Sequence, residues 1–336
     1  MKQKVIATIK YVLLFAIGLS LLWLTFRNEN LAEIFNKLAA ADPFWLGISL
    51  LIGMAAFISR AVRWIMLMEP MGYKPPLSST LYALWLGYFA NLAIPRIGEI
   101  TRCGALARKE KVPFNALIGT VIVERVIDLV MLVFTMTLAA ALEFDLLSNF
   151  LNEKLISPLK SKFAFTTNPL FPVIVIAVIL IGIWIVYSFF KKGAKERPLV
   201  IKLKGFLHEV GTGFKTILRM KNTGWFVFHT LFIWILYFLM TYVCFFCLDA
   251  TSHLNAKAGL FTLVVGGLGM AAPVQGGIGA YHYIVSQGLQ LFGISTTDGI
   301  VYATLVHTSQ TILVVVLGLF AMLMLFTGKS KGTANG

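Results

Sequence analysis

Charged residues are scarce in this chain: 13% of its 336 residues are Asp, Glu, Lys or Arg, whereas 58% are hydrophobic. A water-soluble protein of this length needs a charged surface, so the composition excludes an ordinary soluble enzyme and predicts a polytopic membrane protein. Acidic residues are rarer than basic ones, with 15 Asp and Glu against 29 Lys and Arg. We expect the basic excess to mark the cytoplasmic ends of membrane spans, with no nucleic-acid partner.

Cysteine is also scarce. Cys103, Cys244 and Cys247 are an odd count within apolar sequence, which argues against a disulfide framework. The stretch CFFC at 244–247 has the spacing of a redox motif or of half a zinc site, but no second pair accompanies it, so we interpret its cysteines as small packing residues. The glycine-rich stretch 266–279 lacks the lysine of a phosphate-binding loop. We therefore predict no catalytic residue, no metal and no cofactor.

Six apolar segments are each long enough for a membrane-spanning helix, which needs about 20 residues. They cover residues 5–26, 44–68, 114–142, 169–190, 225–248 and 299–327. The first follows a basic start, as a cleaved signal peptide also would, but no small-residue cleavage site follows it closely, which favours a retained helix. Because only a short tail follows Phe326, we expect a single membrane domain over residues 1–336, with no soluble domain after it.

Two further apolar segments, 78–110 and 257–293, are interrupted by helix-breaking residues. The residues that we single out at these breaks are Asn91, Pro95, Arg96, Gly98 and Glu99 in the first, and Pro273, Gly276, Gly277 and Gly279 in the second. Irregular backbone at membrane depth is tolerated where protein buries it or where it lines a water-filled cavity. Both breaks are therefore candidate substrate-binding regions.

The distribution of basic residues favours six crossings over eight. If each interrupted segment is a re-entrant helical hairpin that returns to its own side, both termini and the basic runs 96–111 and 191–221 are cytoplasmic, together with most of the 29 Lys and Arg residues. If each segment crosses the membrane once instead, both runs lie outside. We therefore predict an all-α polytopic membrane protein with six crossing helices and two re-entrant helical hairpins. The segment 191–221 is expected to be a basic amphipathic helix on the cytoplasmic surface.

The same order of elements, which is span, span, hairpin and span, occurs in residues 1–142 and in residues 143–328. Three crossings in each half turn the second half upside down relative to the first, which predicts an inverted repeat with one hairpin entering from each side. Paired interruptions at corresponding positions are typical of a transport site. Two unrelated helix kinks caused by proline and glycine are the alternative.

The first break has the chemistry of an anion site. A helix that restarts after Pro95 presents free N–H groups and the positive end of its dipole, and Arg96 and Arg102 add full charges nearby. A lipid phosphate fits such a site. The second break carries almost no charge, but its glycines allow the backbone to approach a ligand closely.

Ionisable residues within the apolar segments form a second group of candidates, since such residues are costly in a membrane. Glu124 and Asp128 lie four residues apart and share a helix face, and Arg125 points about a quarter-turn away. Arg60 and Arg63 share one face of another span and could pair with these carboxylates. A purely structural ion network and a role in substrate or proton handling are both open at this point.

Two histidines accompany the second half of the chain. His307 lies in the last span beside Thr304 and Gln310, and we interpret it as an interhelical hydrogen-bonding residue, with proton coupling as the alternative. His282 follows the second break between two tyrosines and is expected at the membrane interface.

Three motifs together resemble the lysylphosphatidylglycerol synthase transmembrane region family, also called flippase-like membrane proteins. They are NLAIPRIGE at 91–99 followed by Arg102, ERVID at 124–128, and PVQGGIG at 273–279. The resemblance covers nearly the whole chain and implies the family's membrane fold and a lipid or lipid-linked substrate. By position it implies a functional centre made of Arg96, Glu99, Arg102, Glu124, Arg125 and Asp128. The larger members carry a soluble domain that aminoacylates phosphatidylglycerol, and we do not expect that activity here.

Together these features predict an integral protein of the cytoplasmic (inner) membrane that moves an anionic phospholipid or lipid-linked intermediate between leaflets and is not an enzyme. Its expected partners are membrane lipids with anionic headgroups, and both a homo-oligomer and a partnership with a lipid- or glycan-synthesis enzyme are open. Two alternatives remain. One is a membrane-embedded lipid-modifying transferase that uses Glu99 or Asp128 as acid or base, and the other is a non-catalytic membrane partner of a synthase.

Overall fold

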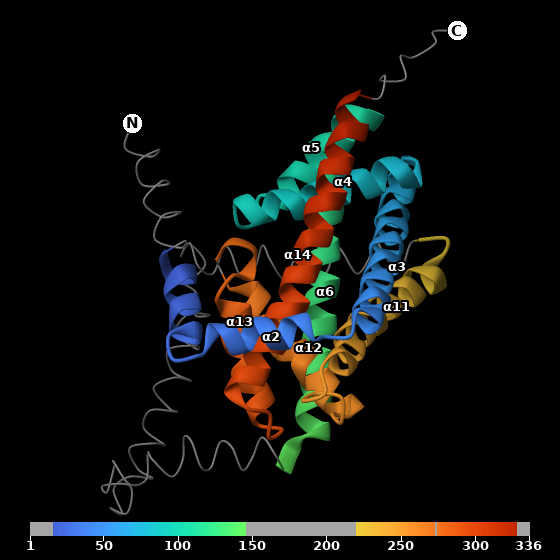
Figure 1. The fold of residues 1–336 in the computed structure, drawn as a ribbon. Helices are drawn as coiled ribbons and strands as arrows, with labels where there is room; N and C mark the ends of the chain where they lie inside the picture. Colours follow the sequence, from blue (N-terminus) through green and yellow to red (C-terminus); the bar gives the residue numbers. More distant parts are fainter. Residues whose placement is uncertain (1–15, 146–219, 273, 328–336) are drawn as a thin grey trace, which may run out of the picture. The chain divides into compact units, whose positions relative to one another are not determined.

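The computed structural model describes residues 16–145, 220–272 and 274–327 (Figure 1). Residues 143–216 separate from the rest of the chain as a second unit, of which only the first three residues are described. The predicted span 169–190 and nearly all of the basic segment 191–221 therefore lie outside the described residues. The fold given below is that of the first unit.

Every regular element within the described ranges is a helix, which confirms the all-α prediction for that part of the chain. The α-helices are Ala16–Phe26, α2 (Leu31–Ala39), α3 (Pro43–Met68), α4 (Leu77–Ala93), α5 (Gly98–Glu110), α6 (Phe114–Leu142), α11 (Thr223–Val243), α12 (Ala256–Ala271), α13 (Ala280–Gln290) and α14 (Thr296–Thr327). Short 3₁₀ turns lie at Glu69–Met71 (η1), Cys244–Cys247 (η5) and Gln275–Gly277 (η6).

Four predicted spans correspond closely to the long helices α3, α6, α11 and α14. By length and composition, three described helices can cross a bilayer, namely Pro43–Met71, Thr223–Cys247 and Thr296–Leu325. Local sequence sets where they begin: the Asp42 carboxylate accepts a hydrogen bond from the N–H of Phe44, and Pro43 occupies the first turn of α3, where a missing N–H costs nothing. The total number of crossings and the inverted repeat stay predictions.

The first interrupted segment folds back on itself as a helical hairpin. Gly87 of α4 lies against Gly98 of α5, and at the far end the Ser79 hydroxyl donates to the Glu110 carboxylate at 2.5 Å, so the two helices run antiparallel. With 17 and 13 residues, these helices are about 25 and 20 Å long, which is short of the roughly 30 Å hydrocarbon core. A hairpin of two short helices agrees with the predicted fold-back and not with one continuous crossing.

The second interrupted segment forms a similar hairpin from α12 and α13. Gly269 lies against the backbone of Tyr281, and near the open end the rings of Phe261 and Phe292 are 5.4 Å apart. These pairs again require antiparallel helices. Glycines in α12 make the close approach possible, because a side chain at Gly269 would collide with the Tyr281 backbone.

The closed ends of the two hairpins meet. Leu92, at the end of α4, contacts Gly276 in the turn between α12 and α13, and α4 packs along η6. The helix Ala16–Phe26 also touches this turn, because Gly18 lies against Ile278 and Gly279. Two breaks that are about 180 residues apart in sequence therefore form one contact in the fold.

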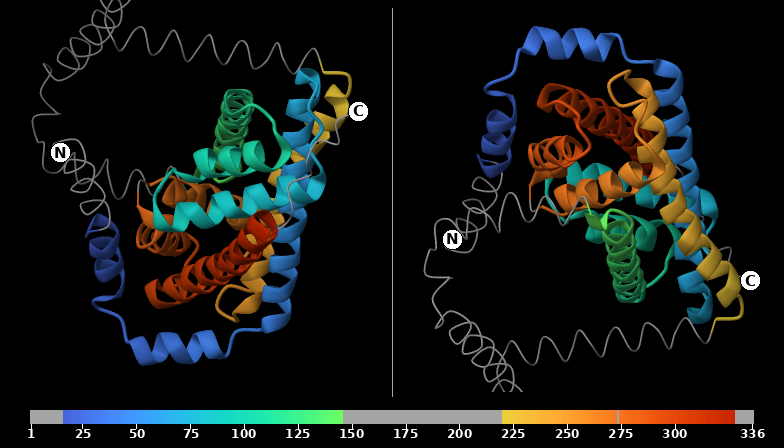
Figure 2. Two further views of the ribbon diagram at one scale, coloured as in Figure 1. Left: turned by 90° about the horizontal axis from the view of Figure 1, so that it is seen from above. Right: turned by 90° about the horizontal axis from the view of Figure 1, so that it is seen from below.

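Helices α3 and α11 lie side by side and antiparallel (Figure 2). The Ser49 hydroxyl donates to the Met240 carbonyl at 3.0 Å near one end, and Ser59 bonds the His229 ring at 2.8 Å toward the other. Helix α2, which the sequence analysis did not predict, lies across α14 (Figure 1). It buries Ile34 and leaves Phe35 67% exposed, which is typical of a helix at a membrane interface.

Candidate functional site

Helix α3 carries two buried arginines on one face. Arg60 and Arg63 are three residues apart, and their side chains are 8% and 0% exposed. A guanidinium cannot lose its charge under ordinary conditions, so burial at these positions requires partners. Their carboxylate partners, Glu124 and Asp128, both come from α6.

Glu124 of α6 is the centre of the cluster. Its carboxylate, which is 1% exposed, accepts from Arg60 at 2.5 Å, from Arg125 at 2.9 Å and from Arg102 of α5 at 3.0 Å, and Arg63 lies 3.6 Å away. Four guanidinium groups thus surround one buried carboxylate. The arrangement makes Glu124 the structural link among α3, α5 and α6.

Asp128, one helical turn after Glu124, completes the cluster. It binds Arg63 at 2.7 Å and Arg125 at 3.1 Å, with Arg60 at 3.6 Å. The four arginines and two carboxylates form the arginine network, whose members are Arg60, Arg63, Arg102, Glu124, Arg125 and Asp128. The predicted pairing between the two charged helix faces is confirmed.

The arginine network holds more positive than negative charge. Four guanidinium groups face two carboxylates, and no other acidic group among the described residues lies within ion-pair distance of them. Several buried guanidinium nitrogens also have no hydrogen-bond partner in the described part of the chain: Arg60 Nε, Arg63 Nε, Arg63 Nη1 and Arg102 Nη1. Such donors are costly in a dry site, so the network is suited to take up a negatively charged group.

Uncharged groups fix the directions of these guanidinium groups. Arg60 donates to the Tyr237 hydroxyl at 2.7 Å and lies 5.5 Å from the centre of the Tyr88 ring. Arg102 lies 4.6 Å from the centre of the Trp64 ring, and the Trp64 ring N–H donates to Thr120 at 2.8 Å. These cation–π contacts position the arginines without neutralising them.

The arginine network has one open edge. The side chain of Arg125 is 43% exposed and that of Asp128 is 17% exposed, whereas the side chains of the other members are at most 8% exposed. A ligand that approaches from this edge would meet Arg125 first. Behind it lie the buried arginines with unused donors.

The residues of the first break shape the turn that positions Arg102. The Asn91 side chain accepts from the N–H of Gly98 at 2.7 Å, so one N–H at the start of α5 is already satisfied. A side chain at Gly98 would collide with the Gly87 carbonyl and the Asn91 amide, so only glycine allows this close approach. Pro95 lies within the turn that the Ile97 N–H closes onto the Ile94 carbonyl, and Arg102 follows one turn into α5.

Arg96 and Glu99 lie apart from the arginine network. Arg96 is exposed and adopts a left-handed backbone conformation with φ of 66°. Neither side chain makes an ion pair with another described residue. Of the six residues expected in the functional centre, the structure brings together Arg102, Glu124, Arg125 and Asp128 and adds Arg60 and Arg63.

The glycines of the second break adopt backbone conformations that favour glycine. Gly276, Gly277 and Gly279 have φ values of 56°, 76° and 79°. The Gly276 carbonyl is bonded to the His307 ring at 2.7 Å, which is the interhelical role expected of His307. Pro273 lies outside the described residues.

His282 and the two cysteines of the CFFC stretch are buried residues. His282 is 5% exposed and lies 4.8 Å from the His307 ring, so it is a buried residue of the core and not an interfacial one. Cys244 and Cys247 are free and buried, as the packing interpretation expects. Within the described ranges, no group of three His, Cys, Asp or Glu side chains could hold a metal ion.

Sequence reasoning missed the aromatic partners of the network, Trp64, Tyr88 and Tyr237. Aromatic residues are common in apolar helices, so nothing in the sequence marks these three. Only their position beside a guanidinium group distinguishes them.

Comparison with known protein families identifies a relationship over most of the chain. The model of the lysylphosphatidylglycerol synthase TM region family matches residues 11–318. The match includes the arginine network and both breaks. No curated protein and no solved structure matches the chain.

Proposed function

Because this chain belongs to the lysylphosphatidylglycerol synthase TM region family, we propose that it moves an anionic phospholipid, or an anionic lipid-linked intermediate, between the leaflets of a membrane. The family and the apolar helices make it an integral membrane protein. The proposal places it in the cytoplasmic membrane with both termini on the cytoplasmic side, as the distribution of basic residues predicts.

One observation carries this proposal: the arginine network contains two more positive than negative charges and keeps unused guanidinium donors in a buried setting. A phosphate group supplies the missing negative charge and offers several acceptor oxygens to planar guanidinium forks. A network that served structure alone would be expected to balance its charges.

The individual residues have distinct roles in this proposal. Arg125 at the open edge meets the headgroup phosphate, and Arg102 and Arg63 complete its coordination with their unused donors. Glu124 and Asp128 hold the arginines in place when no lipid is bound, and the phosphate competes with them for the same guanidinium groups. Arg96, which is exposed and lacks a described ion partner, attracts the headgroup before it reaches the network.

The meeting of the two hairpin tips supports a transport path rather than a fixed scaffold. In an inverted repeat, one hairpin enters from each side and the tips meet within the membrane, as the tips of these hairpins meet at Leu92 and Gly276. Small movements of either tip would then open the interior to one leaflet at a time. Because the sequence lacks the lysine of a phosphate-binding loop in its glycine-rich stretch, the proposal draws its driving force from a gradient or from none.

The carboxylates argue against a transferase. A catalytic acid or base must exchange protons at a wet pocket. Glu124 is 1% exposed and surrounded by guanidinium groups, and Asp128 is bound by two arginines. Glu99 makes no such pair, so replacement of Glu99 by Gln with retained lipid exchange would count further against an enzyme.

The test is leaflet exchange of fluorescent phosphatidylglycerol in liposomes. We expect protein-dependent exchange that is lost in Arg125→Gln and Arg102→Gln and weakened in Arg96→Gln. Lys74→Gln is the matched control, because Lys74 is a 79%-exposed basic residue that pairs with Glu69, outside the network. Folding of each variant is checked by its elution volume and melting temperature. Normal exchange in folded Arg125→Gln and Arg102→Gln proteins would overturn the proposal.

Phosphatidylcholine provides the specificity control. If the excess of arginine selects the headgroup, exchange of this zwitterionic lipid should be slower than that of phosphatidylglycerol, and the difference should shrink in Arg125→Gln. Equal rates for both lipids would show that the network does not select anionic headgroups.

A further inference from the structure

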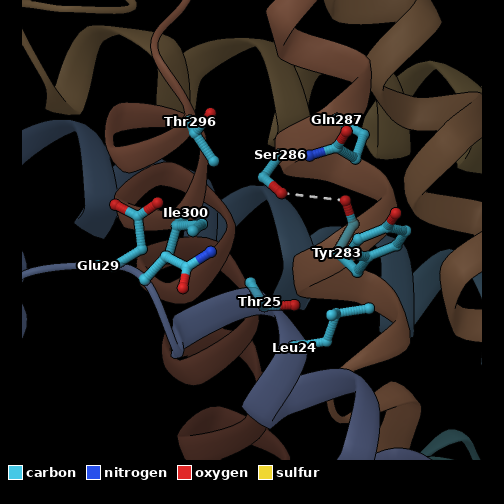
Figure 3. Close-up of a pocket in the computed structure, with 9 residues that line it drawn as sticks. Leu24, Thr25, Glu29, Tyr283, Ser286, Gln287, Thr296 and Ile300 are labelled. Atoms are coloured by element: carbon cyan, nitrogen blue, oxygen red, sulfur yellow. Dashed lines mark hydrogen bonds between the residues drawn. The ribbon is translucent and has the colours of Figure 1, made fainter.

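A seam between the helix Ala16–Phe26 and the helices α13 and α14 contains two neighbouring cavities. The smaller has a volume of about 110 Å³, and its lining includes the polar residues Asn28, Glu29, Ser286 and Gln287. Figure 3 shows Glu29, Ser286 and Gln287 around it. Its other lining residues are Leu24 and Thr25 near the end of the helix Ala16–Phe26, Tyr283 of α13, and Thr296 and Ile300 in the first turns of α14. The seam is formed by helices that do not contribute to the arginine network.

The larger cavity lies one helical turn further along the seam. Its volume is about 420 Å³, within the roughly 300–1,000 Å³ typical of small-molecule sites. It is lined by Leu19, Leu22, Trp23, Phe26, His282 and Thr304. On α14 the step from Ile300 in the small cavity to Thr304 in the large one is four residues, which is about one turn.

Two residues that line the larger cavity, His282 and Thr304, each have a buried polar atom without a partner. Nδ1 of His282 and Oγ1 of Thr304 are buried and make no hydrogen bond with any described residue. His282 is 5% exposed. The neighbouring His307 ring donates from Nε2 to the Gly276 carbonyl, and no hydrogen bond joins it to the His282 ring. A buried polar atom without a partner is costly, so a ligand group that bonds to these two atoms is expected.

The geometry points to a second lipid site, distinct from the arginine network: the seam holds one acyl chain of a membrane phospholipid. The leucine and aromatic side chains contact the chain, and His282 and Thr304 donate hydrogen bonds to its ester carbonyl. The carbonyl oxygen has two lone pairs and no proton, so it can accept from both groups at once. The polar part of the lipid extends toward the small cavity and the rim of the seam.

The rim also fits a phospholipid. The guanidinium group of Arg27 lies 5.2 Å from the centre of the Trp23 ring. A cation is therefore held beside the apolar cavity, at the C-terminal end of the helix Ala16–Phe26. Trp23 is 63% exposed, which leaves the seam accessible from its outer side. A phosphate next to Arg27, an ester carbonyl about one helical turn further into the seam and an acyl chain beyond it would follow the order of these groups in a phospholipid.

The test is photocrosslinking of the intact protein in nanodiscs. The probe is phosphatidylglycerol with a diazirine in one acyl chain, at a small fraction in phosphatidylethanolamine, and crosslinked peptides are identified by mass spectrometry. We expect crosslinks to concentrate at residues 19–26 and 282–304. Leu22→Trp should abolish them by filling the cavity, and Leu231→Trp, on the exposed face of α11, is the matched control and should not reduce them.

The hydrogen-bonding groups are tested separately. His282→Phe combined with Thr304→Val should reduce crosslinking in the seam about tenfold, as expected for the loss of two neutral hydrogen bonds. Thr304→Val alone preserves shape and should give about a threefold loss, which keeps the test valid if the double variant does not fold. Crosslinks spread evenly over α11 and α14, or unchanged seam crosslinks in folded Leu22→Trp, would overturn the proposal. Because the readout is binding in the seam, its failure is separate from any failure of lipid exchange through the arginine network.

Discussion

Leu92 and Gly276 lie in contact, although one ends the first helix of one hairpin and the other lies in the turn of the second. A side chain atom added at Gly276 would lie 3.1 Å from Cδ2 of Leu92. The contact joins the two breaks that the sequence marks with proline and glycine. It is the direct physical link between the two parts of the chain that we expect to alternate during transport.

Paired cysteines at this contact should crosslink. With the native cysteines replaced, Leu92→Cys combined with Gly276→Cys should form a disulfide under mild oxidation, because the Cα atom of Leu92 lies 4.0 Å from a Cβ built at Gly276. Leu92→Cys combined with Gly293→Cys is the control, since a Cβ at Gly293 has no neighbour within 4 Å. Gel mobility with and without reductant measures the yield. Equal yields for both pairs would contradict the contact.

Glu124→Gln should be strongly destabilising. Removal of this carboxylate leaves three buried guanidinium groups and that of the half-exposed Arg125 with Asp128 as the one remaining carboxylate of the network, and the breaking of a buried ion pair costs about 3–5 kcal/mol. Glu99→Gln, the matched control on α5, removes a carboxylate that makes no described ion pair and should change stability by less than about 0.5 kcal/mol. Denaturant unfolding in detergent micelles measures both. Similar losses for the two variants would mean that the network does not stabilise the helix arrangement.

Gly98→Ala and Gly104→Ala should have effects of opposite sign, although both glycines lie in α5. A methyl group at Gly98 collides with the Gly87 carbonyl and the Asn91 side chain, and overpacking of this kind costs about 1–3 kcal/mol. At Gly104 nothing lies within 4 Å, so alanine should stabilise the helix by about 0.8–1 kcal/mol. Thermal unfolding of the two variants checks the signs. Because Gly98 sets the hairpin that carries Arg102, Gly98→Ala should also slow lipid exchange.

The ion pair between Lys37 and Asp298 should make a small contribution to the attachment of α2. The two groups are 2.7 Å apart, but the Lys37 side chain is 37% exposed, so a double-mutant cycle with Lys37→Met and Asp298→Asn should give about 0.2–1 kcal/mol. The hydrogen bonds to Asp298 and then to Glu33 raise the pKa of Lys37 above its usual value. The coupling is therefore complete at neutral pH and is lost as the pH rises through this raised pKa. A coupling that disappeared between pH 6 and 8 would contradict this assignment.

The sequence was sufficient to predict the position and length of the long apolar helices. The bounds predicted for the segment 114–142 coincide with α6, and those of the segment 44–68 differ from α3 by a single residue. Burial in lipid forces every backbone group into internal hydrogen bonds, so a long apolar run has little choice but to be a helix. Proline and glycine likewise marked both breaks, because their backbone preferences act locally.

The sequence was less informative about short helices and about polar side chains that pack against distant helices. Helix α2 is nine residues long with a charged face, so it falls below the length that marks a span. His282 lies between two tyrosines, which suggested an interface, but it packs against His307 from another helix. Local pattern cannot show which distant helix will cover a polar side chain.

For the candidate site, the sequence by itself determined which charged residues are candidates. These are two carboxylates one turn apart on α6, two arginines on one face of α3, and an arginine after the first break. Charge in an apolar helix is costly, and this cost made each of them a candidate. Only the tertiary structure decided that Arg60, Arg63 and Arg102 converge on Glu124, that Arg96 and Glu99 do not, and that Leu92 meets Gly276. The reason is physical: the cost of a buried charge is a property of one residue and its segment, whereas the partner that offsets it depends on how separate helices pack.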